Sequence, residues 1–289
     1  MWKLGIIGGS GLYAIDGLED ARWVTVDSPW GEPSDAILTG HIAGMEVCFL
    51  PRHGRGHRIP PHQLNVRANI DALKRLGCTD VLAVSAVGSL NQAMAPGEFV
   101  VVDQFIDRTK GRPSTFFEAG LVAHVPMADP VCPRLSALAA DAVAAVGGRV
   151  HRGATYLAME GPAFSTRAES RLHQAWGCDL IGMTAMPEAK LAREAELPYA
   201  LVAMVTDFDC WHDGSDVDVT DIMAVMHGNA ALARAMIVTL CASLPATRAA
   251  SPIDCVLDQA IMTAPDARDP ALLARNSAIL KRWLNRSGG

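Results

Sequence analysis

An apolar run from Leu197 to Val205 constrains the fold more than any other feature, because it ends abruptly in Thr206-Asp207-Phe208-Asp209-Cys210-Trp211. A short apolar run with this ending predicts a buried strand. Side chains two residues apart on a strand share a face, and ligands of open α/β sheets bind at the carboxyl ends of the strands. We therefore predict that Asp207 and Asp209 lie side by side at a binding edge. Alternatively, an Asp here caps a helix or forms a turn.

Strand-like and helix-like runs alternate along the rest of the chain, which predicts an α/β fold with a largely parallel sheet. We expect strands over residues 4–8, 46–50, 80–85, 99–103, 180–184 and 199–206, and helices over 63–76, 133–146, 166–176, 187–196 and 219–244. No long linker or internal repeat divides the chain. Residues 1–289 are therefore predicted to form a single domain, with a helical C-terminal extension from about residue 250 to 289.

Charge and cysteine usage narrow the class of protein. The formal net charge of −6 gives no general attraction to nucleic acid or to an anionic membrane, and no uninterrupted apolar run approaches the roughly 20 residues that span a bilayer. The seven cysteines form no CxxC pair, so a disulfide framework or a zinc site is not expected. Because the amino terminus has no convincing cleavage site, we expect a cytoplasmic protein.

Two candidate anion sites follow predicted strands. Gly8-Gly9-Ser10-Gly11 could present backbone N–H groups and the Ser10 hydroxyl, although a plain glycine turn is the alternative. Arg52-His53-Gly54-Arg55-Gly56-His57-Arg58 predicts a strong local positive field that suits phosphate. The interleaved arginines would repel a metal ion, so we rank anion binding above metal binding, and a solvated basic loop is the alternative.

Three further segments could line a site. Ser85-Ala86-Val87-Gly88-Ser89 ends a strand in small residues, and Met183-Thr184 closes another. Met159-Glu160-Gly161-Pro162-Ala163-Phe164-Ser165 places an acid, an aromatic ring and a hydroxyl in one loop. A Met or Phe is usually a core residue, so each segment is weak evidence alone, but a sugar or base site would use such side chains as apolar walls.

Taken together, these motifs resemble those of the 5′-methylthioadenosine phosphorylases, within the trimeric class of purine nucleoside phosphorylases. The resemblance runs from Gly5 to about Leu244. It rests on Gly8-Gly9-Ser10-Gly11-Leu12, Arg52-His53-Gly54-Arg55 with His57, residues 85–89, residues 103–109, Glu160-Gly161-Pro162 and residues 206–211. Ser10 and Ser85 stand where the family usually has Thr, which keeps the hydroxyl.

The resemblance implies phosphorolysis of 5′-methylthioadenosine to adenine and 5-methylthioribose 1-phosphate, a reaction of methionine and purine salvage. It implies a nucleoside phosphorylase-like fold with a central mixed, partly closed sheet flanked by helices, and a homotrimer, with a dimer of trimers left open. Inorganic phosphate would be the co-substrate, with no metal or organic cofactor. By motif, the phosphate-binding residues would be Ser10, Arg52, His53, Ser85, Ala86 and Thr184.

The same resemblance places Met183 against the ribose and Phe164 against the base, with Ser165 and Val219 selecting the substrate. Asp207 would donate a proton to N7 of adenine and Asp209 would hold its 6-amino group. Two carboxyl groups favour a 6-aminopurine over a 6-oxopurine, because an unpaired buried polar group is costly. The alternatives are a purine nucleoside phosphorylase acting on inosine, guanosine or methylthioinosine and, from another class, a non-catalytic nucleotide-binding protein.

Overall fold

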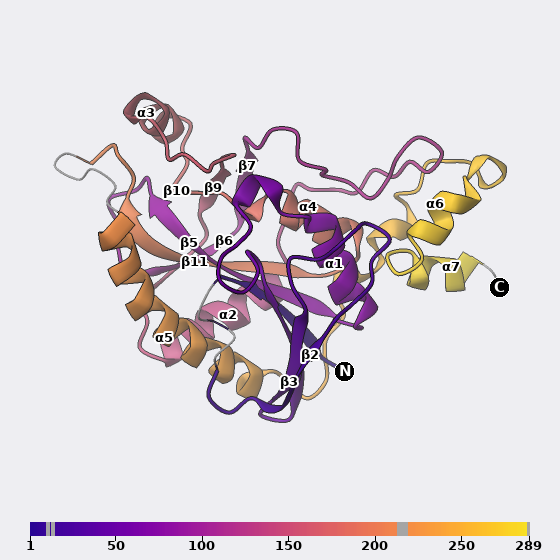
Figure 1. The fold of residues 1–289 in the computed structure, drawn as a ribbon, viewed down its shortest axis with the longest axis horizontal. Helices are drawn as coiled ribbons and strands as arrows, with labels where there is room; N and C mark the ends of the chain where they lie inside the picture. Colours follow the sequence, from indigo (N-terminus) through magenta and orange to yellow (C-terminus); the bar gives the residue numbers. More distant parts are fainter. Residues whose placement is uncertain (10–11, 13–14, 213–218, 288–289) are drawn as a thin grey trace.

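The computed structural model describes residues 1–9, 12, 15–212 and 219–287, without the side chains of residues 219–221, 223, 224 and 287 (Figure 1). Within this part of the chain, eleven strands form one mixed sheet. The strands are β1 (Lys3–Gly8), β2 (Glu19–Val24), β3 (Ile37–Ile42), β4 (Met45–Pro51), β5 (Asp80–Ser89), β6 (Phe99–Val102), β7 (Gln104–Asp107), β8 (Val150–Arg152), β9 (Thr155–Ala158), β10 (Leu180–Gly182) and β11 (Tyr199–Phe208).

The centre of the sheet is parallel and its margins are mixed. The strand β1 pairs in parallel with β4 and β5, and β5 pairs in parallel with β11. The pairs β3–β4, β5–β10 and β6–β11 are antiparallel. The path runs β2-β3-β4-β1-β5-β10-β9-β7, with β11, β6 and β8 branching from β5. The expected mixed sheet flanked by helices is confirmed, but the sheet is not closed, because β2 and β7 do not pair with each other.

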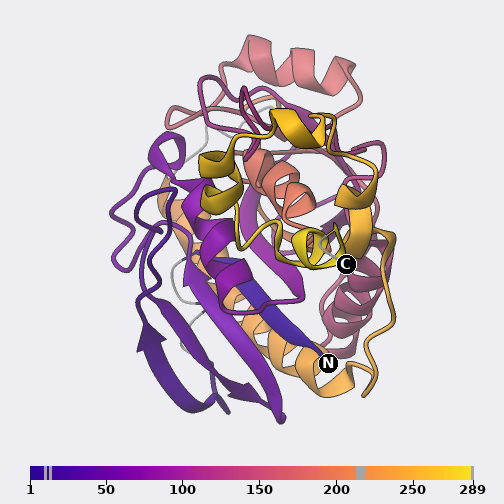
Figure 2. The ribbon, with the colours of Figure 1, turned by 90° about the vertical axis from the view of Figure 1, so that its right-hand side faces the viewer.

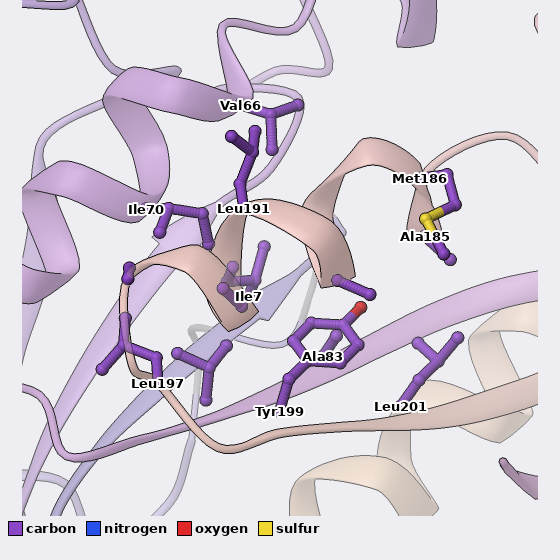
Figure 3. Packing of buried hydrophobic residues seen from close by; sticks show 14 of the residues in the cluster. Ile7, Val66, Ile70, Ala83, Ala185, Met186, Leu191, Leu197, Tyr199 and Leu201 are labelled. Carbon is purple, nitrogen blue, oxygen red and sulfur yellow. The ribbon is translucent and has the colours of Figure 1, made fainter. Parts of the chain in front are cut away.

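Helices cover both faces of the sheet (Figure 1). Consecutive residues of β11 point to opposite faces, so Leu201 packs in one core cluster and Val202 in the other. The first cluster includes side chains of α1 (Val66–Arg75) and α4 (Ala185–Glu194), among them Ile70 and Leu191 (Figure 3). The second includes side chains of α2 (Pro133–Ala145) and α5 (Val219–Ser243). This two-sided cover explains why β5 and β11 are apolar along nearly their whole length.

The short helix α3 (Arg167–Ala175) projects at one end of the molecule (Figure 1). Its start is fixed by a capping box, in which the Thr166 hydroxyl accepts a hydrogen bond from the backbone N–H of Glu169 and the Glu169 carboxylate accepts one from Thr166. Because α3 follows Phe164 and Ser165 directly, this cap also fixes the end of the loop that carries them.

The helix α5 contains one long apolar segment. Val225–Ser243 of α5 could cross a membrane by length and composition alone. This is weak evidence, since core helices of soluble proteins meet the same criterion. Met236, Ile237 and Leu240 are fully buried in the second core cluster, against the sheet. We therefore interpret α5 as a core helix.

The C-terminal segment contains two short 3₁₀ helices, η2 (Pro252–Asp258) and η3 (Pro265–Ala267), and two α-helices, α6 (Pro270–Arg275) and α7 (Lys281–Ser287). A further 3₁₀ turn, η1 (Pro61–Gln63), precedes α1. The C-terminal segment lies on the side of the molecule that carries α4 (Figure 2). The Glu196 carboxylate, just beyond α4, accepts hydrogen bonds from the Leu257 N–H and from Arg282. That residues 1–289 form a single domain remains a prediction.

Candidate active site

The carboxyl ends of the central strands enclose a cavity of about 270 Å³. Its polar lining comes from four places: the turn after β4, the end of β5, the turn between β10 and α4, and the end of β11. This is where ligands of open α/β sheets bind. The predicted site residues that line it are Arg52, His53, Ser85, Ala86, Phe164, Met183, Thr184, Asp207 and Asp209.

Asp207 and Asp209 lie close together as predicted, but Asp209 lies just beyond the strand rather than on it. The register between β5 and β11 shifts between Val205 and Asp207, so Asp207 pairs with Gly88 and Asp209 follows the end of the strand. A Cβ placed on Gly88 would lie 3.2 Å from Oδ2 of Asp207 and 3.6 Å from Cβ of Asp209. Both acids therefore lie close to Gly88, where a side chain would crowd Asp207 and make an ordinary contact with Asp209.

The two carboxyl groups differ in their hydrogen bonding. Asp207 accepts a hydrogen bond from the Thr206 hydroxyl at 2.7 Å. Oδ2 of Asp209 is buried and has no hydrogen-bond partner among the described residues. A buried polar atom without a partner is costly, and it is best explained by a ligand or water that supplies the missing donor. Asp209 thus provides an acceptor for a ligand in the cavity.

Burial raises the pKa of Asp207 to about 6, with the Thr206 hydrogen bond acting in the opposite direction and the nearby Asp209 charge adding to the rise. A carboxyl group with this pKa is protonated in about one molecule in ten at pH 7, far more often than an exposed Asp. Asp207 can therefore act as a proton donor near neutral pH.

Arg52 is nearly inaccessible to solvent, with 2% of its surface exposed. Its Nε and Nη2 donate to the two oxygens of the Glu188 carboxylate at 2.9 and 3.0 Å, and its Nη1 donates to the Val84 carbonyl at 2.9 Å. The guanidinium therefore reaches the cavity already held in one orientation.

His53 lies beside Arg52 and is neutral. Burial lowers its pKa to about 4, and the Arg52 charge also lowers it. A hydrogen bond to the Ile59 carbonyl acts in the opposite direction. Since Nδ1 is 2.9 Å from the Ile59 carbonyl oxygen, Nδ1 carries the proton and Nε2 is left as an acceptor. The ring stacks on His57, with 4.3 Å between the ring centroids. His53 thus offers an acceptor, suited to a protonated phosphate oxygen.

Two hydroxyl groups meet on the same side of the cavity. The oxygens of Ser85 and Thr184 are 3.1 Å apart, and both residues are buried. Thr184 precedes the first turn of α4, and its backbone N–H lies 3.4 Å from the Tyr156 hydroxyl. Ser85, Ala86, Thr184 and Arg52 therefore share the lining of one cavity, where the two hydroxyl groups and the guanidinium can donate to a ligand.

The predicted basic cluster is split by the fold. Arg55 pairs with Asp35 at 2.9 Å, and Arg58 donates to the Ser34 carbonyl at 2.9 Å. Neither lines the cavity. Arg52, the arginine that does line it, is compensated by Glu188. The prediction of a strong local positive field is therefore wrong for the cavity, because the charge of Arg52 is balanced there by Glu188. Fixed donors rather than net charge would hold an anion.

Phe164 is about half exposed and forms part of the lining. Met183 lies against Gly161, where a Cβ would come within 2.4 Å of the Met183 sulfur. Gly161 has φ of +67°, a conformation that favours glycine. The close approach of Gly161 thus sets where Met183 lies.

Three predicted residues are not placed in the cavity. Ser165 is not part of the lining, and its hydroxyl is 3.8 Å from the Met159 sulfur. Ser10 lies outside the residues that the structure describes, as does the side chain of Val219, whose backbone begins α5.

Sequence reasoning missed two parts of the site. The first is the pair Glu188 and Tyr199, which lies behind Arg52 and which no local pattern distinguishes from ordinary helix and strand residues. The second is an apolar wall made by Leu12, Ile222, Met226 and Ala230. The last three of these recur at i, i+4 and i+8 on α5, a helical spacing that was readable but not assigned to the site.

Residues 3–242 match the phosphorylase superfamily. The chain belongs to this superfamily. Among its members, S-methyl-5′-thioadenosine phosphorylase of Cereibacter sphaeroides is 58% identical over 284 residues, which cover 97% of this chain and 98% of the relative. The enzyme of the same name from Bradyrhizobium diazoefficiens is 54% identical over 284 residues, covering 97% and 98%.

Two solved structures of the superfamily match nearly the whole fold. A methylthioadenosine phosphorylase from an antarctic soil metagenomic library superposes with a TM-score of 0.93 at 45% identity, covering 96% of this chain and 99% of that one. Methylthioadenosine phosphorylase from Schistosoma mansoni in complex with adenine gives a TM-score of 0.81 at 34% identity, covering 97% and 98%.

Proposed function

We propose that this superfamily member catalyses the phosphorolysis of S-methyl-5′-thioadenosine, a pentosyl transfer that yields adenine and 5-methylthioribose 1-phosphate for salvage. The observation that carries the proposal is the composition of one cavity, in which a half-buried acid, a buried acid and a group of hydrogen-bond donors lie at the ends of neighbouring strands. The names of the relatives, at up to 58% identity over nearly the full chain, support the choice of substrate.

Departure of adenine needs a proton, because breaking the glycosidic bond leaves negative charge on the base. Asp207 is suited to donate it to N7, since burial keeps its pKa near 6. The unpartnered oxygen of Asp209 is suited to accept a hydrogen bond from the 6-amino group. A 6-oxopurine would instead present an acceptor to this oxygen, which supports an aminopurine substrate.

At the same time, the ribosyl carbon needs a nucleophile. Phosphate would be held by Arg52, Ser85 and Thr184, with the Ala86 backbone beside them and with Nε2 of His53 accepting from a protonated phosphate oxygen. Such fixed donors place the anion close to the anomeric carbon, and its charge stabilises the positive charge that develops on the sugar. Ser10 would join this group, as its motif implies.

We infer that the 5′ substituent of the nucleoside packs against the apolar wall. Leu12, Ile222, Met226 and Ala230 offer contact surface to a methylthio group. A free 5′-hydroxyl placed there would lose its hydrogen bonds to water without replacement. We therefore infer a preference for methylthioadenosine over adenosine.

The test is to incubate the protein with methylthioadenosine, adenosine, methylthioinosine or inosine, each with and without phosphate, and to measure the free base. We expect adenine from methylthioadenosine, released only with phosphate. Release of hypoxanthine from inosine as the fastest reaction would favour a purine nucleoside phosphorylase instead. Adenine released without phosphate would indicate a hydrolase, and no release from any substrate would leave a nucleotide-binding role.

We further propose that the enzyme needs no metal or organic cofactor, works in the cytoplasm and assembles as a homotrimer or a dimer of trimers. Unchanged activity after dialysis against EDTA would support the first point. The seven cysteines, free in the structure, suit a reducing compartment. Analytical ultracentrifugation would give the assembly, and a monomer at assay concentrations would contradict it.

A further inference from the structure

Four of the five N–H groups of Arg52 point to acceptors within the described part of the protein. A guanidinium has five N–H groups. Nε and one Nη2 hydrogen go to Glu188, the second Nη2 hydrogen points at the Ile7 carbonyl at 3.4 Å, and one Nη1 hydrogen goes to Val84. Within the described part of the chain, this leaves one N–H of Nη1 for a ligand in the cavity.

The partner that takes two of these donors is itself held from a second side. The Tyr199 hydroxyl, at the start of β11, donates to Oε1 of Glu188 at 2.8 Å. Glu188 and Tyr199 are each about 1% exposed, so water does not compete for these hydrogen bonds. Glu188 is therefore clamped between the guanidinium and a phenol, and its carboxylate has little freedom to rotate.

Glu188 lies four residues after Thr184, near the start of α4. Met186, between them, has φ of −116° and ψ of 135°, so the helix is interrupted there and the two side chains do not share one helical register. The Glu188 carboxylate is instead held by its hydrogen bonds with Arg52 and Tyr199.

Burial alone would favour loss of the Arg52 charge, but the Glu188 carboxylate more than offsets this effect and the pKa of Arg52 is raised. The guanidinium thus stays charged, but its charge is balanced inside the protein. An incoming phosphate would therefore gain less from long-range attraction and more from one well-directed hydrogen bond.

We propose that Glu188, held by Tyr199, is a positioning residue that fixes Arg52 so that its one remaining N–H is directed to phosphate in the cavity. This inference rests on the proposed function. It assigns Glu188 a role through Arg52, without contact to the nucleoside.

A competing role for Glu188 is charge balance alone, and the two roles predict opposite results. In Glu188→Gln the amide has one oxygen acceptor, and its NH₂ group would face a guanidinium N–H, so Arg52 must turn away. If position matters, the KM for phosphate rises by about 10- to 100-fold, as when an outer-shell partner is lost at other sites. If charge balance alone matters, the freed positive charge attracts phosphate and its KM falls.

Two further variants keep the proposal testable if Glu188→Gln fails to fold. Glu188→Asp keeps the negative charge but withdraws it by one methylene, so it should also raise the KM for phosphate. Tyr199→Phe removes one of the hydrogen bonds to the carboxylate at nearly constant volume, and we expect a rise of about two- to fivefold. In each variant the KM for methylthioadenosine should stay within about twofold of the wild type, since Glu188 acts on the phosphate end.

A matched control exists elsewhere in the chain. Glu196 makes a similar bidentate pair with Arg282, at 2.6 and 2.7 Å, away from the cavity. Glu196→Gln should lower the melting temperature but leave both KM values unchanged. It thereby separates loss of a buried carboxylate from loss of Arg52 positioning.

The experiment is steady-state kinetics on the full chain, varying phosphate and methylthioadenosine in turn. A selective rise in the KM for phosphate in the Glu188 and Tyr199 variants supports the proposal. A fall, no change, or an equal rise for both substrates overturns it. If the wild type does not release adenine from methylthioadenosine, the proposed function itself has failed, which is a different result from active variants that match the wild type.

Discussion

Replacing Asp207 by Asn should stabilise the folded protein at neutral pH. Burial raises the pKa of Asp207 from 3.8 to about 6, so the fold binds this proton more tightly than the unfolded chain does. Two pKa units correspond to about 3 kcal/mol. Above pH 6 the ionised carboxylate therefore destabilises the fold by up to this amount, and the penalty disappears as the pH falls from 6 to below 3.8.

Asn carries no charge at any of these pH values, and its amide oxygen can still accept the Thr206 hydrogen bond. The free energy of unfolding of Asp207→Asn should exceed that of the wild type by about 1–3 kcal/mol at pH 7.5, and by less than about 1 kcal/mol at pH 4. The assay is urea unfolding of both proteins at each pH, at one fixed protomer concentration, because assembly would also contribute to stability.

Asp107 provides a control with the opposite sign. Its carboxylate pairs with Lys190 and accepts hydrogen bonds from Thr109, which outweigh burial and lower its pKa. Its stabilisation is present above the unfolded pKa and is lost as the pH falls, so Asp107→Asn should be less stable than the wild type at pH 7.5. If Asp207→Asn is also less stable at pH 7.5, or if its advantage does not change with pH, the argument from burial of Asp207 is refuted.

Three other predictions concern the cavity. Asp207→Asn should lose most turnover on methylthioadenosine and gain relative activity on methylthioinosine, and an unchanged preference in base-release assays would contradict its base-reading role. Gly161→Ala should raise the KM for the nucleoside and cost about 1–2 kcal/mol of stability, because φ is +67° and the new Cβ meets the Met183 sulfur; kinetics and thermal unfolding that match the wild type would argue against this. The His53 ring should stay neutral down to about pH 5 in the free protein, and an NMR titration with a midpoint near 6.5 would show that burial does not control it.

The elements that the sequence predicted well are those with long apolar runs. β5 and β11 are fully buried along most of their length, and helices such as α2 match the predicted boundaries within a residue or two. The strand β2 was missed because it is an exposed edge strand with the sequence Glu-Asp-Ala-Arg-Trp-Val, which contains no long apolar run. Strands β8 and β9, of three and four residues, were also missed. The equally short β6 was predicted because all four of its residues, Phe99–Val102, are apolar.

The candidate site also has parts that local sequence predicts and parts that it does not. The proximity of Asp207 and Asp209 was predictable because they are two residues apart at the end of a long apolar run, although Asp209 lies just beyond the strand. The state of Arg52 was not predictable, because its partner Glu188 lies 136 residues away and meets it through the packing of α4. Local sequence shows a cluster of positive charge, whereas the fold decides which of those charges are already balanced.

The strand β5 has a consequence for the size of the substrate. Ser85 lies at the donor end of the cavity and Gly88 lies under the two acids, and both belong to this one strand. A strand advances about 3.3 Å per residue, so β5 holds the anion end and the base end of the cavity about 10 Å apart. A molecule of another length cannot engage both ends at once. Inserting one residue between Ser85 and Gly88 would lengthen this separation by about 3.3 Å.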